Sequence, residues 1–233
     1  GYTLRNVYAR WTKAYLKNVD MFACITEFQK KKLIETGYDK NKITVIPNSI
    51  DAPCSYTLTT GGYIAYIGRL SYEKGYDLLV EVARKHPEIK FRFAGAQREQ
   101  KNTDIPSNVE FAGYLQKDKL LEFIQKARFI VIPSRCYEGF PMAILEAACH
   151  GKLAIASNHG GFTEIIGQGE NAIGKLFEPG NTDDLDKQIA ELWNNQTLTE
   201  ELGEKAFRKL KKHYDSEVVY KQWETLFSKL KNS

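Results

Sequence analysis

The fold is decided by the stretch FIVIPSRCYEGFPMAILE, residues 129–146. Its first four residues are all apolar, which predicts a buried strand. Pro133 and Ser134 end that strand, and Pro141 suits the first position of a helix, where its missing N–H costs nothing. The stretch therefore predicts a strand, a turn and a helix in direct succession.

Two glutamates frame the turn and the helix. Glu138 lies in the turn, and Glu146 follows about 12 Å further on if the interval is fully helical. Gly139, Phe140 and Pro141 allow close backbone approach and leave N–H groups unpaired. A helix N-terminus favours phosphate, and carboxylates accept hydrogen bonds from sugar hydroxyls. The pattern suits a long ligand that is anionic in its middle. The alternative is a solvated carboxylate followed by an ordinary helix glutamate.

Strands and helices alternate outward from this stretch. Strands are expected at residues 63–67, 89–93, 109–111, 129–132, 153–156 and 172–177. This alternation predicts an α/β fold, a doubly wound parallel sheet of Rossmann-like type with helices on both faces. Ligands of such sheets bind outside the carboxyl ends of the strands. The candidate loops are therefore 68–75, 95–98, 113–115, 134–141 and 157–161. No G-x-G-x-x-G follows the first strand, so the dinucleotide fingerprint is missing.

Three regions are expected along the chain. Residues 1–50 contain two short strands, 21–25 and 42–46, which are too few for a stable sheet of their own. We interpret them as the tail of a truncated N-terminal domain. Residues 51–214 form the Rossmann-like domain, and residues 215–233 form a C-terminal helical tail that crosses back towards the N-terminal part. A basic, aromatic helix is expected over residues 1–19; it suits an anionic membrane surface or, as its scattered apolar positions favour, a protein surface.

Composition excludes several classes of protein. The chain has 233 residues, of which 42% are hydrophobic and 27% charged, so it can bury a core. No apolar stretch approaches the roughly 20 residues that span a bilayer. A net charge of +4 without a binding signature gives no reason to expect nucleic acid. Cys24, Cys54, Cys136 and Cys149 have no metal-ligand spacing, which indicates buried thiols in a reducing compartment.

Two cations share the loop after the first strand of the larger domain. Arg69 offers a planar fork and Lys74 a compact charge, and both can reach a diphosphate. For Lys74 alone, a solvated loop cation would be the better interpretation. His159 lies in a glycine-containing loop and suits either a ligand contact or solvent. Glu164 suits either a hydrogen bond near the site or a cap of its own short helix, and we favour the cap. His86, His150 and His213 are expected at helix ends.

These motifs together resemble a known family. Gly68-Arg69-Leu70 through Lys74-Gly75, Glu138-Gly139-Phe140-Pro141 with Glu146 eight positions after Glu138, and Gly160-Gly161 with Glu164 resemble the nucleotide-binding half of a retaining, GT-B-fold glycosyltransferase of family 4. The resemblance runs from about Asp20 to the C-terminus. The paired glutamates combined with the Arg/Lys loop are specific, whereas either part alone is weak.

The resemblance implies a role for each matched residue. Arg69 and Lys74 would hold the diphosphate of a sugar nucleotide, and Glu138 would contact a hydroxyl of the transferred sugar. These three would form the catalytic set. The donor site would be completed by Gly68, Gly113, Tyr114, Leu115, Gly139, Phe140, Pro141 and Glu146. Among these, Glu146 would bind the ribose and residues 113–115 the base. The family needs no metal and no cofactor, and it implies front-face transfer with retention.

The expected function is transfer of a hexosyl group from a UDP- or GDP-linked sugar to a glycan or lipid-linked acceptor. The family binds its acceptor in the N-terminal domain, so this chain alone is expected to bind donor without transferring sugar. It would act in the cytoplasm, in polysaccharide biosynthesis, with peripheral contact to the cytoplasmic membrane face. The alternatives are a non-catalytic nucleotide-sugar-binding module and a GT-B-fold sugar-nucleotide epimerase.

Overall fold

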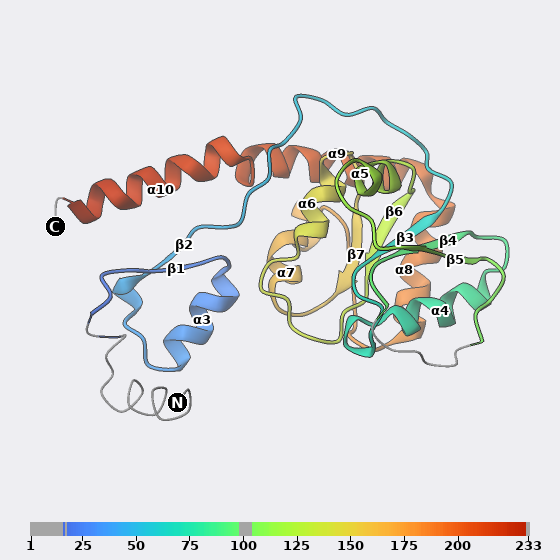
Figure 1. Ribbon diagram of the computed structural model, residues 1–233, viewed down its shortest axis with the longest axis horizontal. Coiled ribbons are helices and arrows are strands. Elements are labelled where there is room, and N and C mark those ends of the chain that lie inside the picture. The colour runs from blue at the N-terminus through green and yellow to red at the C-terminus, as the bar shows by residue number, and fades with distance from the viewer. Residues whose placement is uncertain (1–15, 17, 98–103, 232–233) are drawn as a thin grey trace.

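The computed structural model describes residue 16, residues 18–97 and residues 104–231. Apart from residues 16, 18 and 19, the helix expected over residues 1–19 lies outside this described part of the chain. Within it, the chain forms a larger α/β unit and a smaller unit built around two strands, as Figure 1 shows.

The larger unit is built on a six-stranded parallel sheet, which confirms the predicted doubly wound α/β fold. Among the described residues its strands are β3 (Ile64–Ile67), β4 (Phe91–Ala94), β5 (Val109–Gly113), β6 (Phe129–Ile132), β7 (Ala154–Ser157) and β8 (Lys175–Phe177). Their order is β5-β4-β3-β6-β7-β8, and all neighbours are parallel. The winding reverses between β3 and β6, which makes their carboxyl ends the topological switch point where such sheets bind ligands.

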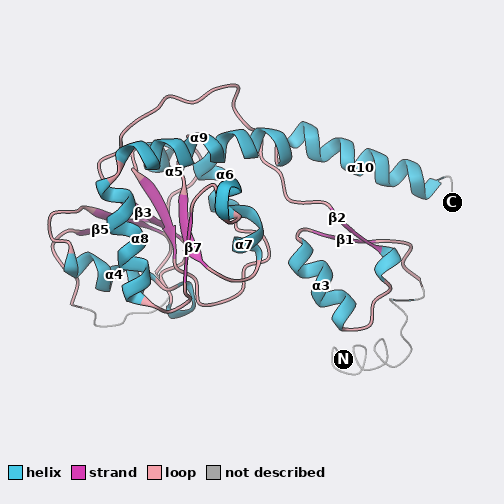
Figure 2. Ribbon diagram, turned by 180° about the vertical axis from the view of Figure 1, so that it is seen from behind, coloured by secondary structure: helices cyan, strands magenta, loops and turns pink. Residues whose placement is uncertain are grey.

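Helices cover both faces of this sheet (Figure 2). The helices α5 (Asp118–Gln125), α6 (Met142–Ala148) and α7 (Gly161–Ile166) pack on one face, and α4 (Tyr76–Lys85) and α8 (Thr182–Asn194) pack on the other. The long helix α9 (Gln196–His213) contributes to both apolar clusters. Side chains alternate between the faces as strand geometry requires, so Ile64 and Tyr66 lie with α4 while Ala65 lies with α5.

The predicted strands match the observed ones within two residues, with one exception. Strand β8 begins at Lys175, three residues later than predicted. The amide of Ile173 donates to Ile166 O at 2.9 Å, at the end of α7, instead of joining the sheet. The first residues of the apolar run 172–177 are therefore bonded to the end of α7, and the run pairs with β7 only from Lys175 onward.

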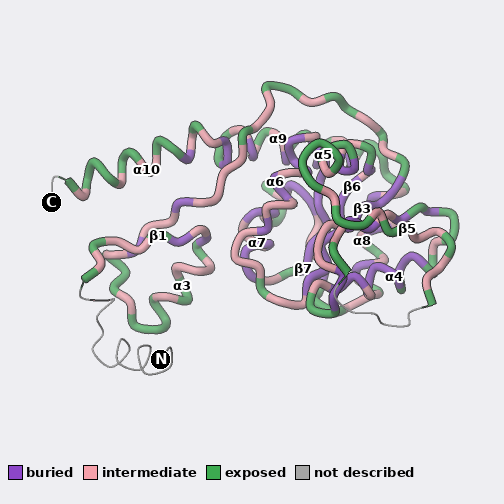
Figure 3. Tube along the Cα trace, in the orientation of Figure 1, coloured by how far each residue is buried: buried purple, intermediate pink, exposed green. Residues whose placement is uncertain are grey.

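The smaller unit pairs β1 (Phe22–Cys24) with β2 (Ile43–Val45) in parallel, with α3 (Glu27–Glu35) between them. Thr26 caps α3, since its Oγ1 accepts from the amide of Gln29 at 3.2 Å. Burial differs between the units: the four central strands of the larger unit, β3, β4, β6 and β7, are largely buried, whereas α3 holds no buried residue (Figure 3). The small unit thus has little core of its own.

The chain passes between the units at two points that lie against each other. The amide of Ile50 donates to Tyr214 O at 3.0 Å, and the amide of Ser216 donates to Ile50 O at 3.1 Å. Helix α10 (Ser216–Lys231) then extends over the smaller unit (Figure 1). Tyr214 and Asp215 separate α9 from α10, so a new helix begins within one residue of the start expected for the C-terminal helical tail.

Candidate functional site

The predicted site residues gather at the switch point of the sheet. Gly68 follows β3 and Pro133 follows β6, and these two strands are direct neighbours. The loops 68–75 and 133–141 therefore leave the same edge of the sheet side by side. The pairing of β3 with β6 thus brings together two loops that lie more than sixty residues apart in sequence.

A dense set of hydrogen bonds joins the two loops. The carbonyl oxygen of Glu73 accepts from the amides of Arg135 and Cys136, at 2.8 and 3.3 Å, and from Ser134 Oγ at 3.3 Å. The Arg135 guanidinium donates to both carboxylate oxygens of Asp77, at 2.7 and 2.8 Å, and to Tyr72 O at 2.7 Å. Such a bidentate pair fixes orientation as well as energy. Arg135 therefore holds the cation-bearing loop against the glutamate-bearing loop.

Gly75 shows how closely the loops approach. Its φ is +70°, and a Cβ added there would lie 1.8 Å from Pro133 O. Only glycine fits this position, both because of its left-handed backbone and because no side-chain atom has room. The glycine next to Lys74 is therefore a packing requirement of the site.

Lys74 and Glu138 form an ion pair where the two loops meet. Their side chains are 19% and 23% exposed, and Ser134 Oγ donates to the same Glu138 oxygen at 3.3 Å. The structure thus brings together two residues that the sequence placed in one constellation. Ser134 was missed as a site residue, although a serine directly after a buried strand at the switch point is a signal that the sequence does carry.

A cavity of about 270 Å³ opens beside this pair. Its lining comes from the end of β3, the end of β6 and the start of α6. The lining residues are Tyr66, Ile67, Gly68, Lys74, Ile132, Glu138, Phe140, Pro141, Met142 and Ala143. Pro141 is the N-cap of α6, with extended angles of φ −76° and ψ 95°, so the prediction that it occupies the first helical position was wrong. The first amides of α6, which have no intrahelical acceptor, follow at this wall.

A second cavity of about 560 Å³ adjoins the first, because both are lined by Ile67 and Gly68. Arg69, Tyr114, Leu115 and Leu120 contribute to its walls. Arg69 pairs with Glu73 at 3.3 Å while remaining 42% exposed, so its guanidinium is available to a ligand. Tyr114 is 68% exposed. The predicted diphosphate cation and the predicted base contacts therefore line one continuous depression.

The backbone next to Tyr114 is also set for close approach. Gly113 ends β5 with φ +73°, and a Cβ there would meet nothing within 4 Å. Lys117, two residues after Leu115, has φ +48° and lines the larger cavity. A non-glycine residue at such an angle is held by its surroundings. Sequence reasoning missed Lys117, which adds a cation at this wall.

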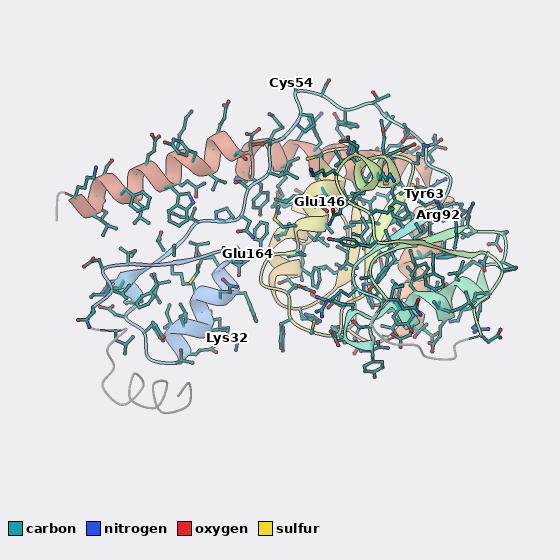
Figure 4. The ribbon with its side chains drawn as sticks, in the orientation of Figure 1. Lys32, Cys54, Tyr63, Arg92, Glu146 and Glu164 are labelled. Atoms are coloured by element: carbon teal, nitrogen blue, oxygen red, sulfur yellow. The ribbon has the colours of Figure 1, made fainter. Side chains whose placement is uncertain are left out.

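Glu146 differs from the other predicted site residues. It lies in the body of α6, three residues after Ala143, and does not line either of the two cavities. Burial raises the pKa of its carboxyl, and among the described residues no hydrogen-bond donor contacts it. Figure 4 shows this side chain in the larger unit. Since the helix begins only at Met142, the interval from Glu138 to Glu146 is not fully helical, and the spacing of about 12 Å that full helicity would give does not apply.

Helix α3 of the smaller unit contacts the glutamate-bearing loop. The ring of Phe28 stacks on Tyr137 with centroids 5.5 Å apart, and a Cβ on Gly139 would lie 2.6 Å from Gln29 Nε2. The amide of Phe28 donates to Glu164 Oε2 at 3.3 Å. The expectation that Glu164 caps its own helix was wrong: its carboxylate serves α3, 136 residues earlier.

The histidines lie where the sequence predicted them, whereas two of the four cysteines do not. His159 faces the site loop, with Nε2 3.0 Å from Ser134 O, and His86, His150 and His213 lie at helix ends as predicted. Cys24 and Cys149 are buried, but Cys54 is exposed and Cys136 half-buried, so the prediction of four buried thiols was wrong. Within residues 18–97 and 104–231, no group of three His, Cys, Asp or Glu side chains is placed to hold a metal ion.

Known proteins are similar to this chain in sequence or in fold. The profile of the family described as "Glycosyl transferases group 1" matches residues 57–209. An uncharacterized glycosyltransferase of Methanocaldococcus jannaschii is 32% identical over 193 residues, which cover 80% of this chain and 53% of that protein. The chain thus spans about half the length of this relative.

Two solved structures resemble the fold. HepE of Anabaena, crystallised in complex with UDP, has a TM-score of 0.80 at 18% identity over 90% of this chain and 64% of its own. Sucrose-phosphate synthase from Thermosynechococcus elongatus has a TM-score of 0.79 at 21% identity over 94% of this chain and 60% of its own. The fold is therefore that of a GT-B-like, Rossmann-like α/β domain. The chain belongs to the group 1 glycosyltransferase family.

Proposed function

We propose that this chain is the donor-binding part of a retaining glycosyltransferase of family 4. It would take a hexosyl group from a UDP- or GDP-linked sugar for transfer to a glycan or lipid-linked acceptor. The observation that carries the proposal is the Lys74–Glu138 pair, which lies in the wall of the switch-point cavity beside the first turn of α6. Family membership and the UDP complex of the HepE structure support it.

The two adjoining cavities divide the donor between them in this proposal. The diphosphate lies where they meet, at Gly68, within reach of the Arg69 and Lys74 cations and the first amides of α6. The sugar occupies the smaller cavity against Glu138 and the backbone of Gly139, Phe140 and Pro141. The base occupies the larger cavity against Gly113, Tyr114 and Leu115. Glu146 lines neither cavity but lies one helical turn beyond Ala143, and we assign it to the ribose hydroxyls.

The chemistry follows from where charge develops. Breaking the anomeric C–O bond leaves negative charge on the departing diphosphate. Arg69, Lys74 and the α6 N-terminus stabilise that charge more in the transition state than in the ground state. These groups do the work that a metal does elsewhere, so we propose metal-independent transfer. When the diphosphate takes up Lys74, the Glu138 carboxylate is released to accept a hydrogen bond from a sugar hydroxyl.

The setting of the reaction is also proposed. Cys24, Cys54, Cys136 and Cys149 are all free thiols, which supports a reducing, cytoplasmic compartment. No helix among the described residues is long and apolar enough to cross a membrane. We propose a role in polysaccharide biosynthesis with peripheral contact to the membrane face. We also propose that transfer, as opposed to donor binding, needs the acceptor side that family members carry elsewhere in their sequence.

Isothermal titration calorimetry with UDP, GDP and ADP tests the donor site. We expect saturable binding of one nucleotide, weakened about tenfold in Glu146→Ala by loss of hydrogen bonds to the ribose. Glu201→Ala, at an exposed glutamate of α9, is the matched control and leaves the affinity unchanged. Equal binding by the chain and Glu146→Ala would contradict the ribose assignment, and no binding of any nucleotide would contradict the donor site.

A further inference from the structure

Helix α9 carries a row of cations that the donor site does not use. Lys205, Arg208, Lys209 and Lys212 recur at spacings of three and four residues, which places them on one face of the helix. With His213 and Asn171 they line a groove of about 370 Å³ between α9 and the loop before β8. That volume falls in the range of about 300–1,000 Å³ typical of small-molecule sites. We call it the α9 groove.

The cations of the α9 groove are poorly neutralised. In the part of the chain that the structure describes, Lys205 and Lys212 have no carboxylate within ion-pair distance. Lysines elsewhere do: Lys85 lies 2.7 Å from Asp183, and Lys175 lies 2.8 Å from Glu191. Arg208 pairs with Glu204 on its own helix at 2.5 Å. The four cations that line the groove thus outnumber its one lining carboxylate, Glu170, and the charges of Lys205 and Lys212 are not paired within the described residues.

The pKa shifts of two groove residues agree with this excess of positive charge. Partial burial lowers the pKa of His213, and the charges of Lys212 and Lys209 lower it further. Burial also lowers the pKa of Lys209, whose ammonium donates to Ile165 O at 2.6 Å at the end of α7. A bound anion would reverse the effect on His213, because a nearby negative charge favours the charged imidazolium.

We propose that the α9 groove is a second anion site, which binds a phosphate group. Lys205, Arg208 and Lys212 would contact the phosphate oxygens. Asn171 and Glu170, which also line the groove, supply an amide donor and a carboxylate acceptor for hydroxyl groups next to the phosphate. The ligand class is a hydroxylated phosphate, which is either a soluble sugar phosphate or the headgroup of a phospholipid. The groove shares no lining residue with the two switch-point cavities.

Histidine NMR tests this directly, since the chain has four histidines. Inorganic pyrophosphate is titrated in while the pKa of His213 is followed. We expect a saturable rise in that pKa. The double variant Lys205→Glu/Lys212→Glu lowers the affinity at this site at least tenfold, because each lost cation removes a charge-assisted contact. Lys187→Glu, on an exposed position of α8, is the control and leaves it unchanged.

The two sites are read separately. His159 Nε2 lies 3.0 Å from Ser134 O, so the resonances of His159 report on pyrophosphate bound at the donor site. The resonances of His213 report on pyrophosphate bound in the α9 groove. Co-sedimentation with phosphatidylglycerol vesicles distinguishes the sources: binding lost in the double variant favours a headgroup, and a His213 response without vesicle binding favours a soluble phosphate. An unchanged His213 pKa together with equal vesicle binding by the chain and the double variant overturns the proposal.

Discussion

The turn before α6 and the body of α6 carry one glutamate each, in opposite surroundings. Glu138 is paired with Lys74 and accepts from Ser134, so its charge is balanced in the absence of ligand. Glu146 is half-buried without a partner among the described residues, and burial raises the pKa of its carboxyl. The fold stabilises the Glu138 carboxylate, whereas burial of the Glu146 carboxylate destabilises the fold.

Glu138 is therefore held in place before a ligand binds, whereas Glu146 is buried without a contact, in the described part of the chain, that offsets its burial. The Glu138 region is built by long-range bonds between loops, so it depends on the loops remaining together. Glu146 is instead buried by packing without a hydrogen-bond partner among the described residues, and in the proposed function a ligand hydroxyl would supply that partner. Functional sites commonly break the rule that buried charges are paired. Substitutions in the loops around Glu138, or at Glu146 itself, test these two situations separately.

The largest effect is expected from Gly75→Ala. The new Cβ would lie 1.8 Å from Pro133 O, at a φ of +70°. Overlap and backbone strain together should lower the free energy of unfolding by about 3 kcal/mol, measured by urea denaturation. Gly113→Ala isolates the strain, because φ is +73° there but nothing lies within 4 Å of the added Cβ. That control should cost about 1 kcal/mol. Equal losses in both variants would contradict the close approach of the loops.

Lys74→Ala removes the cation that faces Glu138. Affinity for the nucleoside diphosphate should fall about 100-fold, because a charge-assisted contact to phosphate is lost and the Glu138 carboxylate is left to repel the ligand. Calorimetry measures the change. Lys85→Ala removes an ion-paired lysine at the C-terminal end of α4 and serves as control, with no change in affinity. A loss of less than threefold in Lys74→Ala would place the diphosphate elsewhere.

Arg135→Lys tests the link between the loops without removing charge. Lysine cannot reproduce the bidentate contact with Asp77, at 2.7 and 2.8 Å, or the bond to Tyr72 O. Stability should fall by about 1–2 kcal/mol, and nucleotide affinity should fall several-fold because Lys74 is less well positioned. Arg84→Lys, at an exposed pair with Asp104, should change neither quantity. A drop in stability with unchanged affinity would show that Arg135 does not position Lys74.

Glu146→Gln should produce the smallest change, a gain in stability. The folded pKa of Glu146 lies above its unfolded value, so the charged form disfavours folding. Glutamine should therefore match the parent at acidic pH, where Glu146 is protonated in both states. Its advantage should appear as pH rises above the unfolded pKa and be complete above the folded one. Thermal melts at several pH values measure this. Glu201→Gln, at an exposed site, should show no such pH dependence; a gain that is absent at neutral pH would contradict the raised pKa.

Much of the larger unit could be predicted from local pattern. The apolar run 129–132 predicted β6 to the residue, because a central parallel strand is buried on both faces. The alternation of elements then identified the switch point and the loops that meet there. Each of these features is determined within a few residues of sequence.

What could not be predicted depends on contacts between distant segments. Nothing near Arg135 in sequence indicates Asp77, 58 residues earlier, and nothing near Glu164 indicates the amide of Phe28. The late start of β8 has the same origin, since the Ile166 carbonyl takes the amide of Ile173. The surroundings of the two glutamates likewise follow from tertiary packing, which one sequence does not encode in any local pattern.

The paired crossing at Ile50 has a mechanical consequence. Two polypeptide segments connect the smaller and larger units, and backbone bonds hold Ile50 against Tyr214 and Ser216 at 3.0 and 3.1 Å. Because the two connections are bonded to each other at one place, we expect a turn of the smaller unit about that place to displace the connections little. Such a turn would change the contacts of Phe28 and Gln29 with Tyr137 and Gly139. We therefore expect motion of the smaller unit to reach the loop that carries Glu138.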